Sequence, residues 1–278
     1  MRAAAIQLNA TAEKARNLER AADLVAAAAA AGAELVVLPE KWNLLGARDD
    51  LLEGAESIDA GPSLAAAGEW AREHRIHLVA GSIAERAEGE ERLFNTSCLL
   101  GPDGELVAAY RKIHMFDVDV GGVSYRESDT EQPGSEIVDA EAGGVRIGLT
   151  VCYDLRFPEL YRILAVAGAR VITVPAAFTL ETGRDHWEVL VRARAIENQV
   201  FVIAANQHGQ APPHYHSYGR SMIADPWGLV LAQAADGDGF AIAELDLERL
   251  ERIRESLPSL ANRVHTAYRW PDPAEARP

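Results

Sequence analysis

The strongest constraint on the fold is a regular alternation of apolar runs of strand length with amphipathic runs of helix length. Residues 3–8 are expected to form a strand, and residues 12–31 a helix with Thr11 as its N-cap and Gly32 at its end. The alternation continues to the end of the chain, which favours an α/β layered domain over separate all-α and all-β parts. The strands mix alternating with continuous apolar patterns, which predicts a mixed sheet or two packed sheets.

The other expected elements continue this alternation of strands and helices. Helices are expected at residues 62–74, 158–167, 185–199 and 247–256, and strands at residues 34–38, 76–83, 92–100, 145–151, 171–174, 200–205, 221–224, 229–232 and 240–245, with one more strand ending near Lys112. Residues 115–134 and 208–218 are interpreted as long loops, which are usually functional or disordered. Because no linker or short repeat interrupts the pattern, we expect one domain over residues 1–268 and a tail over residues 269–278.

Composition excludes several classes of partner. The formal net charge is −15, so a general nucleic-acid binder, which needs a basic face, is not expected. No run approaches the roughly 18–20 apolar residues of a membrane span, and the N-terminus becomes polar too soon for a signal peptide. Two cysteines, Cys98 and Cys152, do not form a disulfide framework, which favours a reducing, cytoplasmic location.

Three polar residues stand where apolar runs end: Glu40, Lys112 and Cys152. Ligands of open α/β sheets gather at the carboxyl ends of strands, so these side chains could meet there. Each also has a plain structural alternative. Cys152 could be a small core residue, Glu40 a strand-end cap or salt bridge, and Lys112 part of a solvated basic cluster. Cys98 lacks the position of Cys152 between a strand and a helix and is interpreted as packing.

Together the three residue types suit the hydrolysis of amides. A thiol nucleophile needs a base that takes its proton and later gives a proton to the leaving amine. The tetrahedral intermediate needs a positive charge or N–H donors beside its oxygen. Glu40 would be the base, Lys112 the cation and Cys152 the nucleophile.

Three segments resemble the signature regions of the nitrilase superfamily of carbon–nitrogen hydrolases. They are LPE at residues 38–40, YRKIHMFD at residues 110–117 and CYDLRFPEL at residues 152–160. Residues 186–199 and 217–228 add to a resemblance that covers residues 2–268. Three signatures in this order and spacing are far more specific than a single motif.

The resemblance implies an α/β fold of the αββα four-layer sandwich type, a homodimer, and no metal or organic cofactor. It gives Glu40, Lys112 and Cys152 the roles named above, with a covalent thioester on Cys152. A second carboxylate between the lysine and the cysteine often assists in the family, and Glu127 stands at the matching place. The backbone N–H of Tyr153 would be the other oxyanion donor.

The resemblance also narrows the substrate to small amides. True nitrilases carry Trp-Glu after the cysteine, whereas this chain has Tyr153 and Asp154, so nitriles are not expected. The pattern is similar to the small-amidase branch, where deaminated-glutathione amidase is our first expectation and ω-amidase the alternative. Another aliphatic amidase or a carbamoylase remains a further alternative. The candidate cations for an anionic substrate are Arg156, Arg184 and Arg220, and the candidate lining residues of the pocket are Phe178 and Thr179.

Three rival interpretations remain open. His208, His214 and His216 could bind a metal ion, but no Asp, Glu or Cys in that loop completes a site. A papain-like thiol hydrolase would use His114 or His186 as its base, and neither lies in a recognisable motif. A non-catalytic binding protein of the same fold is the alternative from another class.

Overall fold

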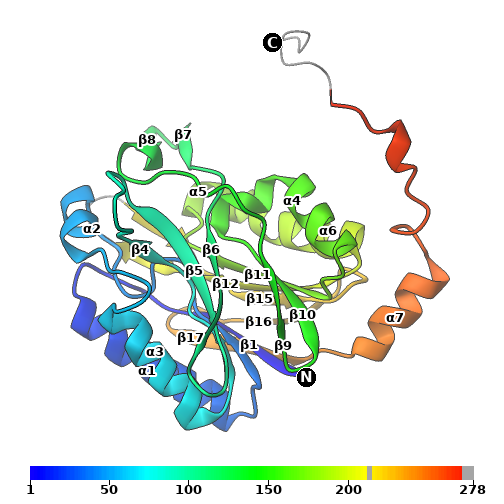
Figure 1. Cartoon of the computed structure of the whole chain (residues 1–278), viewed down its shortest axis with the longest axis horizontal. Coiled ribbons are helices and arrows are strands. Elements are labelled where there is room, and N and C mark those ends of the chain that lie inside the picture. Colours follow the sequence, from blue (N-terminus) through cyan, green and yellow to red (C-terminus); the bar gives the residue numbers. More distant parts are fainter. Residues whose placement is uncertain (212–214, 271–278) are drawn as a thin grey trace.

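The computed structural model describes residues 1–211 and 215–270, which form two packed β-sheets with helices on both outer faces (Figure 1). The expected αββα four-layer sandwich is confirmed. No helix within the described ranges is long and apolar enough to cross a membrane.

The first sheet has seven strands and joins the N-terminal region to a strand from near the C-terminus. In spatial order the strands are β17 (Gly239–Glu244), β1 (Arg2–Gln7), β2 (Leu35–Val37), β3 (His77–Val79), β5 (Phe94–Leu100) and β4 (Ile83–Glu85), and β6 (Leu106–Arg111) also pairs with β5. Strands β1, β2 and β3 are parallel, and β17, β4, β5 and β6 pair antiparallel. This is the mixed pairing that the strand patterns predicted.

The second sheet has six strands from the C-terminal half of the chain. Their order is β16 (Val230–Gln233), β15 (Met222–Ala224), β12 (Phe201–Asn206), β11 (Val171–Ala176), β10 (Val145–Leu149) and β9 (Asp139–Ala142). The central strands β10, β11 and β12 are parallel. Their continuous apolar sequences are typical of strands that are covered on both faces.

Helices cover the outer face of each sheet (Figure 1). α1 (Lys14–Ala30) and α3 (Pro62–His74) pack on the first sheet, and α4 (Pro158–Val166) and α6 (Glu188–Asn198) on the second. α1 buries Ala21, Val25 and Ala28, the spacing of one helix face. α7 (Leu247–Ser256) follows β17 at the bounds expected from the sequence, with Asp246 capping its N-terminus.

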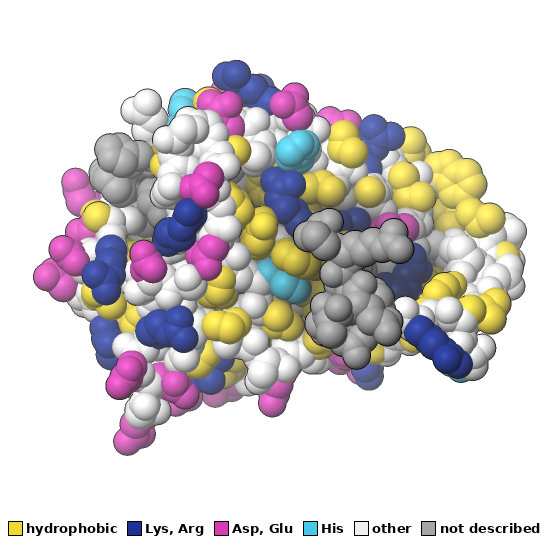
Figure 2. Space-filling view, turned by 90° about the horizontal axis from the view of Figure 1, so that it is seen from above, with side chains coloured by type: hydrophobic (Ala, Val, Ile, Leu, Met, Phe, Trp, Pro, Cys, Tyr) yellow, Lys and Arg dark blue, Asp and Glu magenta, His cyan; other side chains and the backbone are white. Residues whose placement is uncertain are grey.

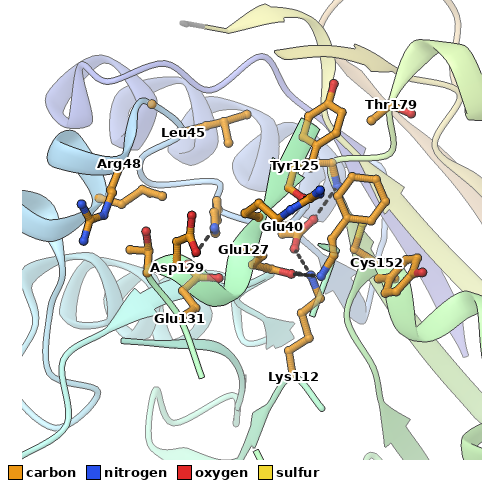
Figure 3. A pocket seen from close by; sticks show the side chains of 18 of the residues that line it. Glu40, Leu45, Arg48, Lys112, Tyr125, Glu127, Asp129, Glu131, Cys152 and Thr179 are labelled. Atoms are coloured by element: carbon orange, nitrogen blue, oxygen red, sulfur yellow. Dashed lines mark hydrogen bonds and ion pairs between the residues drawn. The ribbon is translucent and has the colours of Figure 1, made fainter. Parts of the chain in front are cut away.

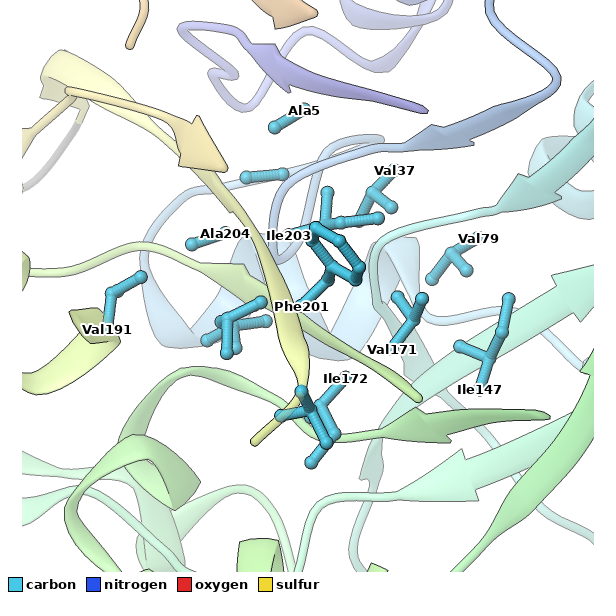
Figure 4. Packing of buried hydrophobic residues seen from close by; sticks show 14 of the residues in the cluster. Ala5, Val37, Val79, Ile147, Val171, Ile172, Val191, Phe201, Ile203 and Ala204 are labelled. Carbon is cyan, nitrogen blue, oxygen red and sulfur yellow. The ribbon is translucent and has the colours of Figure 1, made fainter. Parts of the chain in front are cut away.

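The main hydrophobic core lies between the two sheets (Figure 4). Successive residues of a strand point to opposite faces, so β1 contributes Ala3 and Ala5 to this core but Ala4 and Ile6 to the core under α1 and α3. Phe201 and Val171 of the second sheet fill the space opposite. Side chains from both halves of the chain thus fill one inter-sheet layer.

Some sequence-based expectations about local structure were wrong. The segment 115–134 is not a loop throughout: it contains the hairpin of β7 (Asp117–Val120) and β8 (Val123–Arg126), followed by the 3₁₀ turn η1 (Glu127–Asp129). Residues 208–218 contain β13 (His208–Ala211) and β14 (Tyr215–Tyr218), and residues 212–214 lie outside the described residues. A short helix, α2 (Arg48–Gly54), was not expected.

Two predicted element boundaries also differ from the structure. Helix α1 begins two residues later than predicted, because the Thr11 hydroxyl accepts a hydrogen bond from the Glu13 N–H in a turn before the helix. The helix predicted over residues 185–199 is α6, which is preceded by α5 (Leu180–Thr182) and the π-helical turn η3 (Gly183–Trp187). The wider π turn changes the direction of the chain just before α6 begins.

Gly81 explains why the strand expected over residues 76–83 is two strands. It has φ +45°, and a Cβ atom there would lie 1.9 Å from the carbonyl oxygen of Pro39. Only glycine fits both this close approach and the left-handed backbone. The contact bends the chain between β3 and β4 and packs it against the turn that carries Glu40.

Candidate active site

The three residues singled out at strand ends come together at one end of the sandwich (Figure 3). Glu40 follows β2, Lys112 follows β6, and Cys152 follows β10. All three line a cavity of about 360 Å³ that is bounded on one side by α2 and on another by the β7–β8 hairpin. The first sheet therefore contributes the carboxylate and the cation, and the second contributes the thiol.

Each carboxylate oxygen of Glu40 has a fixed partner. Oε1 accepts hydrogen bonds from Asn95 Nδ2 at 2.8 Å and from Lys112 Nζ at 3.2 Å. Oε2 accepts a hydrogen bond from the Ala177 N–H at 2.8 Å. These donors hold the carboxylate in one orientation close to Cys152, and it raises the pKa of that thiol.

Lys112 is almost completely buried and lies between two carboxylates. Its Nζ donates to Glu127 at 2.7 and 2.8 Å, in addition to Glu40. Burial alone would lower the pKa of Lys112, but Glu127 and Glu40 raise that pKa well above its ordinary value. In the same way, burial opposes ionisation of Glu127, but Lys112 and Lys41 lower the pKa of Glu127 well below its ordinary value. Lys112 is therefore a permanent cation in the cavity.

Cys152 occupies a strained position at the start of the 3₁₀ turn η2 (Cys152–Arg156). Its φ is +46°, a left-handed conformation that is rare for residues with a side chain, and the residue is 8% exposed. Burial and the negative charge of Glu40 raise the pKa of the Cys152 thiol well above its ordinary value, although Lys112 opposes the shift. The resting thiol is thus protonated and needs a base to become a nucleophile.

Asp154 explains how the strained turn is held. Its Oδ2 accepts hydrogen bonds from the Val151 N–H at 2.8 Å and from the Tyr110 hydroxyl at 2.7 Å, and its Oδ1 lies 2.7 Å from His114 Nδ1. Asp154 is fully buried. Tyr110 and His114 flank Lys112 in the sequence, so Asp154 links the turn of Cys152 to the strand end of Lys112.

The histidines do not form a Cys–His pair in this arrangement. His114 stacks on Phe157 with ring centroids 3.5 Å apart, and His186 Nδ1 lies 3.3 Å from Arg156 Nη1. Neither histidine is among the residues that line the cavity. The rival in which one of them is the base therefore has no geometric support.

The alternative interpretation, in which the histidines of residues 208–216 bind a metal ion, also lacks a suitable set of metal ligands in the described ranges. Nowhere in residues 1–211 and 215–270 do three His, Cys, Asp or Glu side chains come together to hold a metal ion. His208 Nε2 lies 2.6 Å from Asp238 Oδ1 instead. His214 lies outside the described residues.

The candidate pocket residues divide into two groups. Tyr153, which was expected to supply an oxyanion N–H, lines the cavity together with Phe178 and Thr179. Arg156, Arg184 and Arg220 do not: the Arg156 guanidinium packs 5.0 Å from the Phe178 ring centre, Arg184 is exposed, and Arg220 pairs with Asp236 at 2.8 Å. The Lys and Arg side chains that do line the cavity are Lys41, Arg48, Lys112 and Arg126.

Sequence reasoning missed three polar residues of the site: Asn95, Lys41 and Glu131. Asn95 Nδ2 bridges Glu40 and Glu127, with 2.8 and 3.1 Å to their Oε1 atoms. Lys41 Nζ pairs with Glu131 Oε1 at 2.7 Å, and both residues are buried. An Asn inside the apolar run of β5 was the one available signal, because a buried amide needs partners.

Glu131 gives a stability prediction with a definite sign. Burial raises its pKa, Lys41 opposes that shift and Glu127 adds to it, and the result is a pKa of about 8 against 4.5 for a free Glu. Folding therefore takes up a proton at Glu131 between those values, so this stability contribution is complete below pH 4.5 and is lost as pH rises toward 8. The variant Glu131→Gln lacks this titration. Its free energy of unfolding minus that of the wild type should therefore increase with pH in that window, by up to about 1.4 kcal/mol per pH unit.

Urea unfolding of both proteins at pH 5, 6, 7 and 8 measures this difference. Parallel pH profiles for the variant and the wild type would contradict the raised pKa.

Similarity to known proteins agrees with the geometry of the site. The family model described as carbon-nitrogen hydrolase matches residues 2–255. A deaminated glutathione amidase from Synechocystis is 42% identical over 267 residues, covering 94% of this chain and 97% of that protein. The omega-amidase NIT2 of Homo sapiens is 41% identical over 268 residues, covering 96% of each. The crystal structure of Saccharomyces cerevisiae Nit3, a nitrilase-superfamily member, matches with a TM-score of 0.85 and 33% identity, covering 93% of this chain and 94% of that one. The chain therefore belongs to the carbon–nitrogen hydrolases of the nitrilase superfamily.

Proposed function

We propose that this enzyme hydrolyses the C–N amide bond of small carboxylate-bearing metabolites through a thioester on Cys152. The observation that carries the proposal is the contact of Glu40 with both Lys112 and Cys152 inside one cavity. The carboxylate, the cation and the thiol that such a reaction needs are thereby within reach of one substrate carbon.

Acylation begins with proton transfer from Cys152 Sγ to Glu40. The thiolate attacks the amide carbon, and the charge on the carbonyl oxygen is stabilised by Lys112 Nζ and the Tyr153 N–H. Glu40 then gives its proton to the leaving nitrogen, the C–N bond breaks, and the thioester remains. The paired position of Lys112 supports its role, because a fixed charge needs no reorganisation during the reaction.

Deacylation uses the same groups in a second round. Glu40 takes a proton from water, the resulting hydroxide attacks the thioester, and the Cys152 thiolate leaves and regains the proton. Glu127 keeps Lys112 in place through both rounds, with its own orientation fixed by the Phe116 N–H at 2.7 Å. This is the assisting role expected for the second carboxylate.

For the substrate we propose deaminated glutathione, with ω-amidase activity on 2-oxo-dicarboxylate monoamides as the second candidate. The Synechocystis relative carries the first activity in its name and the human relative the second. The cavity, at about 360 Å³, leaves room for a leaving group larger than ammonia. That room admits the peptide-like amide as well as the smaller monoamide.

A direct comparison of the two substrates tests the proposal. Both release 2-oxoglutarate, so one coupled assay gives kcat/KM for deaminated glutathione and for 2-oxoglutaramate, with Cys152→Ala as the control. Preference for the first supports our choice, and preference for the second moves the assignment to ω-amidase. Turnover of neither would remove the substrate assignment.

We further propose that the enzyme is a homodimer that pairs through the outer face of α4 and α6. Ile163, Val166, Val189 and Ile196 on this face are between 49% and 65% exposed. Seen from above, hydrophobic side chains gather on the half of the molecule where α4 and α6 lie, and acidic ones on the other half (Figure 2). An apolar surface of this kind is typical of an interface.

The double substitution Val166→Glu and Val189→Glu should convert the dimer to a monomer, because it would bury like charges across the interface. Sedimentation velocity at several concentrations measures the change. A wild type that sediments as a monomer at every concentration would contradict the proposal.

We also propose one domain over residues 1–268 and a cytoplasmic location. The shared core between the sheets supports the first, because it holds residues from Ala3 to Leu250. The two free thiols support the second, since a reducing compartment preserves them.

A further inference from the structure

Asn95 is a buried amide that contacts three groups of the proposed reaction and takes no part in that reaction as described so far. It is the second residue of β5 and is completely buried. Its side-chain Nδ2 donates to Glu40 Oε1 at 2.8 Å and to Glu127 Oε1 at 3.1 Å. Its backbone carbonyl accepts the Lys112 N–H at 2.9 Å. One residue of β5 therefore contacts both carboxylates and the strand end that carries the lysine.

Asn95 and Lys112 close a ring of hydrogen bonds with the two carboxylates. Lys112 Nζ donates to the same Oε1 atoms of Glu40 and Glu127, at 3.2 and 2.8 Å (Figure 3). Each of these oxygens thus accepts one hydrogen bond from a neutral amide and one from an ammonium. The amide must present Nδ2 rather than Oδ1 to the ring, because both of its neighbours there are acceptors.

The other end of the amide shows that packing alone does not explain Asn95. Its Oδ1 is buried and has no hydrogen-bond partner among the protein groups of residues 1–211 and 215–270. A buried carbonyl oxygen prefers a partner, so an apolar side chain of the same size would suit this part of the strand better. The two hydrogen bonds from Nδ2, by contrast, are charge-assisted. The amide is therefore placed to suit the carboxylates.

The donors of Lys112 indicate why Glu40 needs a second one. An ammonium has three N–H groups, and Lys112 Nζ lies within hydrogen-bond distance of three carboxylate oxygens, two of Glu127 and one of Glu40. In the proposed mechanism an N–H must also reach the oxygen of the tetrahedral intermediate. The hydrogen bond to Glu40 is the longest of the three, so it is the one that gives way to the substrate.

Glu40 changes its charge at the same step. Once it has taken the Cys152 proton it is neutral, and the charge attraction between it and Lys112 is lost. Two neutral donors still hold the carboxyl group: Asn95 Nδ2 on Oε1, and the Ala177 N–H on Oε2 at 2.8 Å. A protonated carboxyl group retains acceptor capacity, so these two hydrogen bonds can persist while the proton passes to the leaving nitrogen.

We propose that Asn95 is a positioning residue that keeps Glu40 directed at Cys152 and the leaving nitrogen while Lys112 turns an N–H to the oxyanion. The inference rests on the proposed amidase function and adds a residue to it. Asn95 is not among the residues that line the cavity, so it acts through Glu40 and not through the substrate.

Asn95→Leu tests the proposal, because leucine has a similar size and lacks both N–H donors. The value of kcat should fall by about 10²-fold, since a displacement of about 1 Å at a reacting group has an effect of that order. KM should change by less than about threefold, because no contact with the substrate is removed. Both constants are measured with the two candidate substrates and with small aliphatic amides.

Asn198→Leu is the matched control. It removes another completely buried amide, whose Nδ2 donates to the Arg194 carbonyl at 3.0 Å and whose Oδ1 likewise has no partner in the described part of the chain. Asn198 lies in α6, outside the cavity lining, so its variant should keep the wild-type kcat. A kcat that falls equally in both variants would contradict a specific role for Asn95.

A double variant distinguishes positioning of Glu40 from a general structural effect. In a Glu40→Gln background, assayed at high enzyme concentration, adding Asn95→Leu should lower the residual kcat by less than about threefold, because the group that Asn95 positions is no longer a base. The same 10²-fold loss in both backgrounds would overturn the proposal. If circular dichroism shows that Asn95→Leu is unfolded, Asn95→Ser, which is too short to bridge the carboxylates, gives the same comparison.

The wild type in the same assays separates this inference from the proposed function. A wild type that hydrolyses none of these amides would refute the amidase function, and the positioning role with it. Hydrolysis by the wild type and by Asn95→Leu with equal kcat would refute the positioning role alone. A loss confined to kcat, absent from Asn198→Leu and absent from the Glu40→Gln background, is the expected result.

Discussion

Cys152→Ala is expected to lower kcat/KM for every amide substrate by about 10⁴-fold or more while leaving the fold intact. The side chain is small and 8% exposed, so its loss removes few packing contacts. The chemical loss is far larger, because a thioester needs a thiol, and Cys152 is the one thiol among the described residues that line the cavity. Steady-state assays of the purified variant, with circular dichroism to check the fold, measure both.

Cys98 provides a matched control for this prediction. It is a fully buried thiol in β5, and burial raises its pKa to about 12, so it cannot supply a thiolate at neutral pH. Cys98→Ala should keep wild-type turnover and lose about 1 kcal/mol of stability through the small cavity it leaves. Turnover in Cys152→Ala above about 1% of wild type would remove the thioester from the mechanism.

The sequence predicted much of the fold because local signals agreed with the tertiary structure. Pro62 at the first position of α3 and Asp246 before α7 mark helix starts that the structure keeps. The signals failed where strands are short and partly exposed. The β7–β8 hairpin has four residues in each strand and turns through Gly121 and Gly122. Such short strands beside a glycine pair are typical of a loop when only the sequence is considered.

The site was predictable only in part, for a related reason. Glu40, Lys112 and Cys152 stand at strand ends and in recognisable motifs, so a local pattern indicates them. Asn95 acquires its role through antiparallel pairing of β5 with β6, which brings it beside Lys112, whose N–H donates to the Asn95 carbonyl at 2.9 Å. No local pattern contains that pairing.

The Lys41–Glu131 pair shows the same limit more clearly. The two residues are separated by 90 positions and meet because the turn after β2 and the segment after η1 close the same cavity. Read singly, each is an ordinary surface charge. The arginines that the sequence suggested instead lie in motifs, but outside the cavity lining. The sequence motifs suggested that some cation lines the cavity. Which of the Lys and Arg residues is buried there depends on how the segments pack in the folded chain.

Lys112→Met is expected to lower kcat by about 10³-fold, with a much smaller change in KM, because the cation acts on the transition-state oxygen. The same change should also destabilise the fold by about 3–5 kcal/mol, because Glu40 and Glu127 lose the charge buried between them. Kinetics and urea unfolding of the purified variant measure the two effects.

A double variant separates the catalytic from the structural role of Lys112. Adding Glu127→Gln removes one of the two unpaired carboxylates, so Lys112→Met with Glu127→Gln should regain much of the lost stability. Its kcat should stay as low as that of the single variant, because no cation returns to the oxyanion. Recovery of kcat together with stability would mean that Lys112 acts only by holding the carboxylates in place, and the oxyanion role would then fall to backbone donors such as the Tyr153 N–H.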